Sequence, residues 1–294
     1  MIIIRIQGGL GNQLQQYAMY RKFVHMGTSA KIDLSWFSEE NQKKQYAPRK
    51  LELDLFEHLP YEACTKKEKE AFTGKENSIV AKIVKYLAPG KSKYFHENGR
   101  MYLPEVFQLQ DAYLDGYWAC ESYYHDMLPA LREEIIFPES SNKKNLECME
   151  QMERENSVSI HIRRGDYLNP ENAALFGNIC TEAYYENAIN TICGKIANPH
   201  FYIFSDDTNY AKEKYSTPEF TIVDWNKGKE SFFDIALMNH CKHNICANST
   251  FSFWGVRLNP NPEKIAIRPL KHRNNQQYDR EKMEKLWPGY ILLS

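Results

Sequence analysis

The sequence of 294 residues lacks the features that identify membrane proteins and secreted proteins. No run approaches the roughly 18 apolar residues that a membrane-spanning helix requires. Arg5 interrupts the apolar start at Met1 to Ile4, so we expect no secretory signal. The seven cysteines are odd in number and none form a C-x-x-C pair, which favours a reduced, cytoplasmic setting over a disulfide framework.

An excess of charge of one sign is also lacking. The 37 Lys and Arg residues are matched by 38 Asp and Glu residues, and the net charge of −1 excludes a global cationic field for nucleic acid. With 43% hydrophobic and 26% charged residues, the composition is that of a globular protein rather than a disordered one. Walker A, G-x-S-x-G and H-E-x-x-H motifs are absent, and no nucleophile triad emerges.

The sequence does contain alternating short strands and helices. At the start, an apolar run predicts a strand over 2–6, followed by a glycine-rich loop, a helix that stops near Gly27, and a strand over 31–34. From Ser157 onward, strands are predicted over 158–162, 201–204, 220–223, 244–247 and 264–267, with helices over 181–196 and 230–239. This alternation is typical of a parallel sheet with helical crossovers.

We therefore expect an α/β chain with two Rossmann-like domains whose parallel sheets face a central cleft. The first domain spans residues 1–155 and the second 156–274, and the tail 275–294 is a candidate to rejoin the first. Ligands of open α/β sheets sit beyond the carboxyl ends of the strands, and the polar clusters of this chain fall there.

The first polar cluster is Gly8-Gly9-Leu10-Gly11-Asn12-Gln13, between a strand and a helix. Glycines at such a point let the backbone approach a ligand, and a helix N-terminus attracts phosphate. A dinucleotide fingerprint would need a third glycine in place of Leu14, although Asp33 lies at about the right distance for a ribose carboxylate. A tight structural turn without a ligand is the alternative.

The second cluster is His161-Ile162-Arg163-Arg164-Gly165-Asp166-Tyr167, at the end of a strand. Arg is a permanently charged planar donor that suits a diphosphate, and it stabilises a departing nucleoside diphosphate without a metal. Side chains alternate along a strand, so we expect the two arginines to diverge, one toward a ligand and the other bracing Asp166 or the neighbouring domain. A surface Arg–Asp salt bridge is the alternative.

Two further clusters raise the question of a metal. Ser205-Asp206-Asp207 follows a strand, and paired carboxylates bind a divalent ion in metal-dependent sugar transferases. These two carboxylates are adjacent, and a helix cap or a ribose contact suits them better. His240, Cys241, His243 and Cys246 are interpreted as the end of a buried helix running into a strand, because zinc sites usually join two separated ligand pairs.

The fourth cluster is Asn248-Ser249-Thr250-Phe251-Ser252-Phe253-Trp254-Gly255, again between a strand and a helix. Its hydroxyl and amide groups suit a phosphate cradle or a helix cap, and the two roles are compatible. Asp234 lies within the preceding helix. Its carboxylate is able to accept two hydrogen bonds from the Watson–Crick edge of guanine, with a solvated helix face as the alternative.

In order and spacing, these clusters resemble the motifs of the α-1,2-fucosyltransferases, glycosyltransferase family 11. The resemblance spans nearly the whole chain and is weakest from about Ser38 to Glu155; it departs at Gln15, where the family commonly has Phe. It implies a GT-B fold and an enzyme that transfers L-fucose from GDP-fucose, with inversion, to O2 of a terminal β-galactose on a glycan. It also implies no metal and no cofactor beyond the GDP-fucose donor.

The resemblance further implies roles for individual residues. Arg163 is expected on the β-phosphate and Asp234 on guanine, while Asp166 is expected to orient Arg163 or to accept the acceptor's proton. The catalytic candidates are His161, Arg163 and Asp166. The expected donor-binding residues are Gly9, Gly11, Asn12, Arg163, Ser205, Asp206, Asp234, Asn248, Ser249, Thr250 and Phe251.

Fucose, guanine and galactose follow from the resemblance alone. The residues themselves predict a diphosphate site, which leaves three alternatives open: a metal-independent glycosyltransferase of another donor class, an NAD-binding oxidoreductase, and a non-catalytic nucleotide-binding module.

A lysine-rich segment, residues 66–93, contains eight Lys and three Glu around the apolar Ile79, Val80, Ile83, Val84 and Leu87. A basic amphipathic helix lies on anionic lipid, which would place a cytoplasmic bacterial enzyme peripherally at the inner face of the plasma membrane. A solvated helix packed on its own domain is the alternative.

Overall fold

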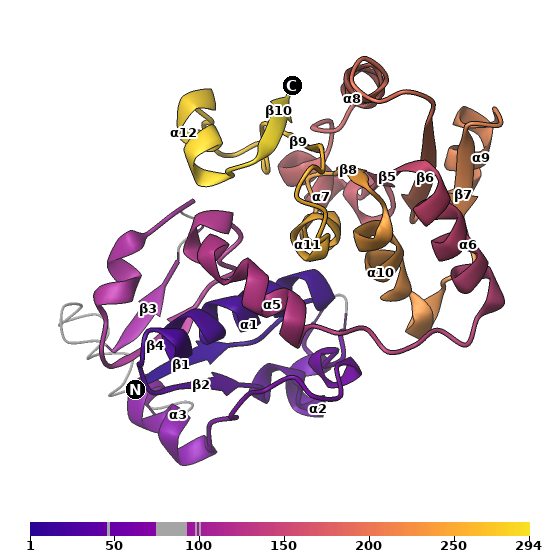
Figure 1. Ribbon diagram of the computed structural model, residues 1–294. Helices are drawn as coiled ribbons and strands as arrows, with labels where there is room; N and C mark the ends of the chain where they lie inside the picture. Colours follow the sequence, from indigo (N-terminus) through magenta and orange to yellow (C-terminus); the bar gives the residue numbers. More distant parts are fainter. Residues whose placement is uncertain (46–47, 75–92, 98, 100) are drawn as a thin grey trace. The chain divides into compact units, whose positions relative to one another are not determined.

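The computed structural model describes residues 1–45, 48–74, 93–97, 99 and 101–294, and it divides into two compact units (Figure 1). The units are Met1–Ile135 and Ile136–Ser294, and each is described by itself. The predicted boundary after residue 155 is misplaced. Helix α6 (Lys143–Arg154) packs on β5 (Asn156–Ile162) and α10 (Phe233–His240), so it belongs to the second unit.

The first unit contains a four-stranded parallel sheet in the order β2-β1-β4-β3. Its strands are β1 (Ile2–Arg5), β2 (Ala30–Asp33), β3 (Tyr94–His96) and β4 (Ala112–Asp115). Its described helices are α1 (Leu10–His25), α2 (Glu39–Gln42), α3 (Lys66–Thr73) and α5 (Leu128–Glu134). The predicted strands at 2–6 and 31–34 are confirmed to within a residue at each end, and the predicted helix stop at Gly27 has the positive φ of +76° that favours glycine.

Buried amides fix the loop that follows β1. Gln13, Gln15 and Gln16 of α1 are all fully buried. The Oε1 atom of Gln16 accepts a 2.8 Å bond from the Gln7 backbone N–H, and its Nε2 donates to the Gly116 carbonyl at 3.1 Å. Because buried polar groups need partners, Gln16 ties the ends of β1 and β4 together.

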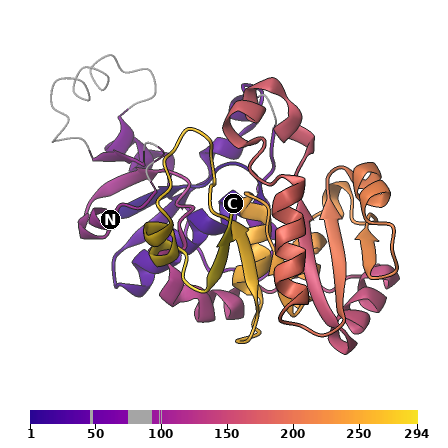
Figure 2. The same cartoon turned by 90° about the horizontal axis from the view of Figure 1, so that it is seen from above.

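The second unit contains a six-stranded parallel sheet in the order β10-β9-β8-β5-β6-β7 (Figures 1 and 2). Its other strands are β6 (Pro199–Ser205), β7 (Phe220–Val223), β8 (His243–Ile245), β9 (Ala266–Pro269) and β10 (Tyr290–Leu293). Its other helices are α7 (Pro170–Phe176), α8 (Glu182–Cys193), α9 (Thr208–Lys214), α11 (Thr250–Leu258) and α12 (Arg280–Leu286). The predicted α/β class with two parallel sheets is confirmed.

The C-terminal tail completes the second sheet. Strand β10 pairs in parallel with β9, and Trp287 lies 4.9 Å from the ring of Phe253 in α11. The Arg268 guanidinium of β9 lies 3.7 Å from the centre of the Trp287 ring. The expectation that residues 275–294 rejoin the first unit is therefore wrong.

The core of the second unit lies on both faces of this sheet. Along β6, Phe201 and Ile203 pack on the side of α8, whereas Tyr202 and Phe204 pack on the side of α6 and α10. This is the two-residue alternation of a strand. Glycine lets two helices approach closely, because a Cβ atom on Gly255 of α11 would lie 2.7 Å from the Cβ of Met238 in α10.

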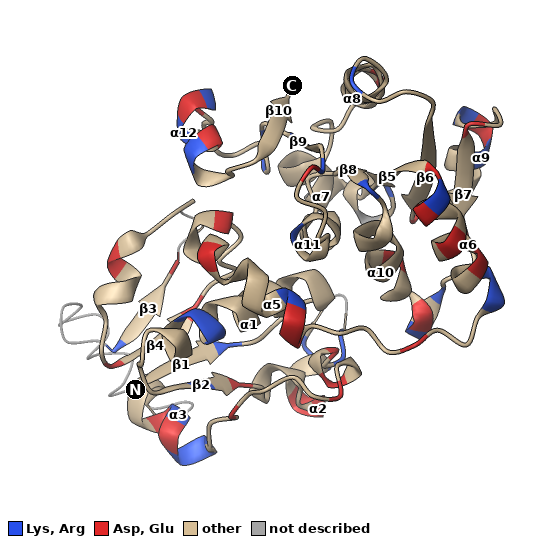
Figure 3. Ribbon diagram, viewed as in Figure 1, with Lys and Arg blue, Asp and Glu red and all other residues tan. Residues whose placement is uncertain are grey.

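The lysine-rich segment begins in α3, where Thr65 and Glu68 form a reciprocal capping box, and where Lys and Glu lie together (Figure 3). Residues 75–92, which include the apolar stripe from Ile79 to Leu87, lie outside the described residues. No helix in the described ranges is long and apolar enough to cross a membrane.

Candidate active site

Neighbouring strands of the second sheet end beside the clusters that the sequence singles out. Strands β5, β6 and β8 end at Ile162, Ser205 and Ile245, and β5 lies between the other two. Because all these strands are parallel, the residues that follow them gather at one edge of the sheet. We call this set the carboxyl edge: residues 161–167, 205–208, 224–226, 234 and 246–251.

Arg163 and Asp206 meet at this edge. Ile162 pairs with Ser205 across β5 and β6, so the next residue of each strand is adjacent to the other. The Nη1 atom of Arg163 lies 3.0 Å from Oδ2 of Asp206, with about a quarter of each side chain exposed. The second carboxylate oxygen of Asp206 accepts a 2.9 Å bond from the backbone N–H of Arg164. Asp206 therefore fixes both the strand end and the guanidinium that follows it.

Arg164 takes a different partner, as the predicted divergence of the two arginines requires. Its Nε donates to Oδ2 of Asp207 at 3.1 Å, and its guanidinium lies 3.9 Å from the centre of the Tyr210 ring. Asp207 and Tyr210 thus brace Arg164, a pairing that the sequence did not indicate. Asp166 lies in the 3₁₀ turn Gly165–Leu168, and its side chain is outside the described part of the structure.

Asp207 is the N-cap of α9, which confirms the cap interpretation for this residue. Its Oδ1 accepts a 3.1 Å bond from the backbone N–H of Tyr210. That bond and the Arg164 guanidinium lower the pKa of Asp207. Ser205 Oγ accepts a 3.1 Å bond from the Asp207 N–H, so the Ser205 hydroxyl holds the backbone just before α9 begins. Both aspartates of the pair thus engage arginines.

Gly165 makes room for Asp206. A Cβ atom on this glycine would lie 2.5 Å from Oδ2 of Asp206, closer than real Cβ contacts come. The same oxygen faces Arg163. Any larger residue at 165 must therefore displace the carboxylate that holds the guanidinium.

His161 lies on β5, almost fully buried, with its ring 5.6 Å from that of Phe251. Burial and the nearby Arg163 charge lower its pKa to about 3, so the ring is neutral at physiological pH. Its Nδ1 has no hydrogen-bond partner within the described residues. A ring with this pKa is a poor general base near pH 7, and its burial against Phe251 is that of a packing residue.

The loop before α11 is held by its own side chains. Asn248 is buried, and its Nδ2 donates to the carbonyls of Phe176 at 3.1 Å and His272 at 3.3 Å. Ser249 is the N-cap of α11, where its hydroxyl accepts a 3.3 Å bond from the Phe251 N–H. The cap prediction is confirmed here. Thr250 and Phe251 form the first turn of the helix, where backbone N–H groups suit an anion.

Asp234 lies in the first turn of α10 and is half-buried. Burial raises its pKa to about 7, and a 3.0 Å hydrogen bond from Nδ2 of Asn226 opposes that rise. Asp234 therefore lies on a half-buried face of α10 and is held by Asn226, rather than standing on a fully solvated helix face. Sequence reasoning missed Asn226 and its buried partner Asn145. A signal existed in α6, because Asn145 shares the buried face with Cys148 and Met152 at helical spacing.

The glycine-rich loop belongs to the first unit. Gly9 precedes α1, Gly11 is buried in it, and Asn12 is half-buried. Gly8 has a φ of +82°, and a Cβ atom there would lie 2.7 Å from Nδ2 of Asn12. The turn thus requires glycine for structural reasons.

Asp33, the ribose carboxylate of the dinucleotide alternative, is already engaged. It is 2% exposed. It accepts bonds from the Tyr113 hydroxyl at 2.6 Å and from the Ser35 N–H at 2.9 Å. These contacts leave no open carboxylate for a ribose and count against that alternative.

The metal interpretations gain no support. Among the described residues, no group of three or more His, Cys, Asp or Glu side chains is placed to hold an ion. Helix α10 ends at His240 and β8 begins at His243, whose Nδ1 accepts a 3.0 Å bond from the Ile265 N–H. The predicted helix-to-strand junction is confirmed.

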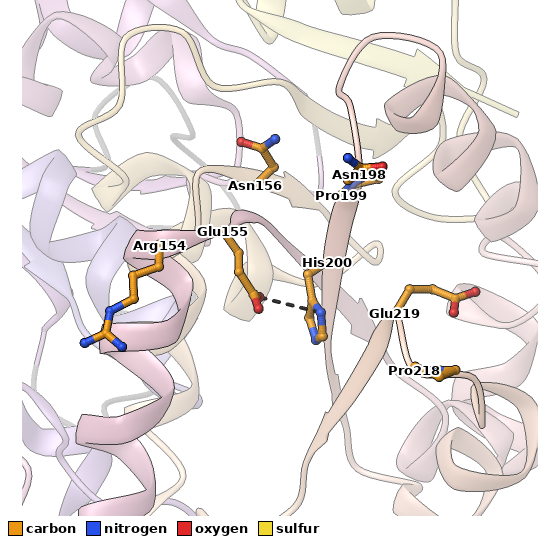
Figure 4. A pocket seen from close by; sticks show the side chains of 8 residues that line it. All are labelled: Arg154, Glu155, Asn156, Asn198, Pro199, His200, Pro218 and Glu219. Carbon is orange, nitrogen blue, oxygen red and sulfur yellow. Dashed lines mark ion pairs between the residues drawn. The ribbon is translucent and has the colours of Figure 1, made fainter.

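A pocket of about 620 Å³ lies at the opposite edge of the second sheet, where β5 and β6 begin (Figure 4). Figure 4 shows the Glu155 carboxylate and the His200 ring pointing toward one another, with Nδ1 of the ring 3.6 Å from the Glu155 oxygen. None of the predicted site residues lines this pocket.

Comparison with known proteins covers nearly the whole chain. A model of the family described as "Glycosyl transferase family 11" matches residues 1–290. The chain is 32% identical over 276 residues to an α-1,2-colitosyltransferase of Escherichia coli, which covers 92% of this chain and 91% of that relative. It is 30% identical over 298 residues to the O-antigen biosynthesis glycosyltransferase WbnK of Escherichia coli, covering 90% and 93%. Human galactoside α-(1,2)-fucosyltransferase 1 is 24% identical over 165 residues, covering 52% and 45%.

Proposed function

We propose that this chain, which belongs to glycosyltransferase family 11, transfers L-fucose from GDP-fucose, with inversion, to O2 of a terminal β-galactose. The observation that best supports this proposal is the position of the Arg163 guanidinium. Asp206 holds it at the carboxyl edge of a parallel sheet, within the segment that matches the family motif. Relatives that carry an α-1,2 linkage in their names support the linkage.

In the proposed reaction, the acceptor O2 attacks the anomeric carbon of fucose on the face opposite GDP. The new O–C bond forms as the bond from that carbon to the β-phosphate oxygen breaks, and the acceptor hydroxyl passes its proton to water or to the Asp166 carboxylate. Negative charge develops on the departing oxygen. Arg163 is permanently charged and its fork is held in place, so it stabilises that charge without a metal.

The remaining donor contacts are proposals that rest on the family motifs. Asp234 receives the N–H groups of guanine, and the first turn of α11 receives a phosphate through the N–H groups after Ser249. Ser205, Asp206 and Asn248 act through the positions of Arg163 and of the loop. The proposal that Gly9, Gly11 and Asn12 also bind the donor rests on the family motif alone.

A second sugar is favoured by one relative. The 32% identical protein is named an α-1,2-colitosyltransferase, and colitose is fucose without its 3-hydroxyl. A site that hydrogen-bonds this hydroxyl discriminates strongly against the deoxy sugar, whereas a site that only packs against it does not. The transfer rates from GDP-fucose and from GDP-colitose therefore show which of the two sugars the site accepts better.

The direct test gives the purified chain GDP-fucose, GDP-colitose or UDP-sugars with a panel of β-galactosides, in the presence and absence of EDTA. We expect an α-1,2-linked fucosyl product, identified by NMR, and turnover unchanged by EDTA. Faster transfer from GDP-colitose would reassign the sugar. Transfer only from UDP-sugars, or activity that EDTA abolishes and Mn²⁺ restores, would overturn the proposal.

A cytoplasmic location and peripheral contact with anionic membrane through residues 66–93 remain proposals. Co-sedimentation with anionic vesicles at low salt is the measurement, and an absence of binding removes the membrane contact.

A further inference from the structure

A buried chain of polar side chains reaches Asp234 from α6. Asn145 is fully buried and Asn226 is 7% exposed. Their amides bond reciprocally: Nδ2 of Asn145 donates to Oδ1 of Asn226 at 2.9 Å, and Nδ2 of Asn226 donates back at 3.0 Å. The same Nδ2 of Asn226 donates to Oδ1 of Asp234 at 3.0 Å.

The residues at the two ends of this hydrogen-bond network, Trp225 and Asp234, determine which way its amide groups face. The Nε1 of Trp225 is only able to donate, and it donates to Oδ1 of Asn145 at 2.6 Å. An ionised carboxylate is only able to accept, so Asn226 must present its NH₂ group to Asp234. Ser140 Oγ accepts a further 2.9 Å bond from Asn145. The amide groups of Asn145 and Asn226 are therefore all bonded when Asp234 acts as an acceptor.

The network engages one oxygen of Asp234. Within the described residues, no hydrogen bond reaches Oδ2, which leaves that oxygen for a ligand. The titratable and charged neighbours are few: the Cys148 thiol of α6 interacts electrostatically with Asp234, and Lys144 lies over the Trp225 ring. Asp224, in the loop after β7, is paired with Lys212. Asn226 is thus the group that directly opposes the burial of the carboxylate.

We propose that Asn226, itself held by Asn145 and Trp225, is a positioning residue that keeps the Asp234 carboxylate ionised and aimed at the nucleobase of the donor. This inference rests on the proposed function. A guanine base offers two donors to a carboxylate, N1–H and the 2-amino group, whereas a protonated carboxyl group accepts only part of that pattern. Base discrimination therefore depends on the charge of Asp234, and so on Asn226.

The test compares binding of GDP and inosine diphosphate (IDP) by calorimetry from pH 5.5 to 8.5. IDP lacks the 2-amino group, and the titration of the diphosphate is common to both ligands. We expect the wild-type preference for GDP to be about tenfold or more at high pH and to fall as pH drops through about 7, as Asp234 becomes protonated.

Asn226→Leu removes the donor at nearly constant volume. Losing a bond that favours the charged form raises the pKa of Asp234, so the midpoint of the preference should move about one pH unit upward. GDP binding at pH 7 should weaken up to about tenfold. Asn259→Leu is the matched control. Asn259 is 1% exposed and bonds to the Cys241 carbonyl at 2.7 Å and to Asn244 at 2.9 Å.

The inference is supported if the pH midpoint of the GDP preference moves upward in Asn226→Leu but not in Asn259→Leu. Equal effects of the two variants on midpoint and preference would mean a purely structural role and would overturn it. If Asn226→Leu does not fold, Asn226→Ser and Asn145→Leu replace it with the same expected direction. A wild-type protein that binds neither GDP nor IDP overturns the proposed donor itself, and the inference with it.

Discussion

The Asp206 carboxylate lies 3.0 Å from the Arg163 guanidinium because the strands that carry them pair Ile162 with Ser205. Two residues 43 positions apart in sequence are thus adjacent in space through sheet register alone. Asp206 also accepts the Arg164 N–H, so one carboxylate orients both the backbone and the side chain of the motif. This relationship assigns Asp206 the role of orienting Arg163.

Gly165→Ala tests that role without touching either charged group. The added Cβ would lie 2.5 Å from Oδ2 of Asp206 and must push it away from Arg163. A misplacement of about 1 Å in a positioned group costs on the order of 10²-fold in rate, and we expect kcat to fall by that order. Gly194→Ala, where the nearest atom is 3.4 Å away, is the control and should keep its activity. A Gly165→Ala enzyme with wild-type kcat would contradict the orienting role of Asp206.

The pH dependence of stability should include a contribution from Asp207. Its pKa is lowered in the folded state by the Tyr210 N–H and by Arg164. The stabilisation is therefore present above the unfolded pKa of about 4 and is lost as pH falls below it. Asp207→Asn keeps the cap oxygen but not the charge. Measured by urea unfolding, its free energy of unfolding should fall less between pH 7 and pH 3 than that of the wild type. Identical acid losses would show that Asp207 does not contribute.

Trp287→Ala should destabilise the second unit by about 3–5 kcal/mol. The ring is 3% exposed and covers the Arg268 guanidinium at 3.7 Å, so its loss leaves a cavity beside a buried cation. Lys285→Ala, exposed on the same α12 helix, should change the free energy of unfolding little. If the two variants unfold at the same urea concentration, the tail does not hold the sheet edge as the structure indicates.

Much of the second sheet is predictable because strands β5 to β9 each have a local signal, whereas β10 in the C-terminal tail is not predicted. The run Phe201–Phe204 is apolar on both faces, as a strand covered by helices on both sides requires, and Ser205 to Asp207 mark its end. Strands β3 and β4 carry weaker signals. Tyr94–His96 is three residues long, and Ala112–Asp115 ends in an acidic residue that the sheet buries against Arg5.

The candidate site is only partly predictable, for a physical reason. Arg163 and Asp207 are recognisable in the sequence because they are charged residues just after a strand, and the strand backbone largely determines their positions. The burial of Asn145 is readable from its helical spacing with Cys148 and Met152, but nothing in the sequence indicates that Asn226, 81 positions later, completes its hydrogen bonds. The unit boundary was missed for a similar reason, since the attachment of α6 depends on its contacts with α10 rather than on any break in the sequence.

The most direct measurement of the central claim is the steady-state kcat with GDP-fucose for Arg163→Ala and Arg163→Lys. Removing one preorganised donor from the departing phosphate should lower kcat by roughly 10²–10³-fold. Lys keeps the charge but loses the fork, so it should recover little of that loss. Arg154→Ala, at the exposed pocket on the opposite edge, is the matched control and should leave kcat unchanged. An Arg163→Ala enzyme within threefold of the wild-type kcat would contradict the assignment of Arg163 to the leaving group.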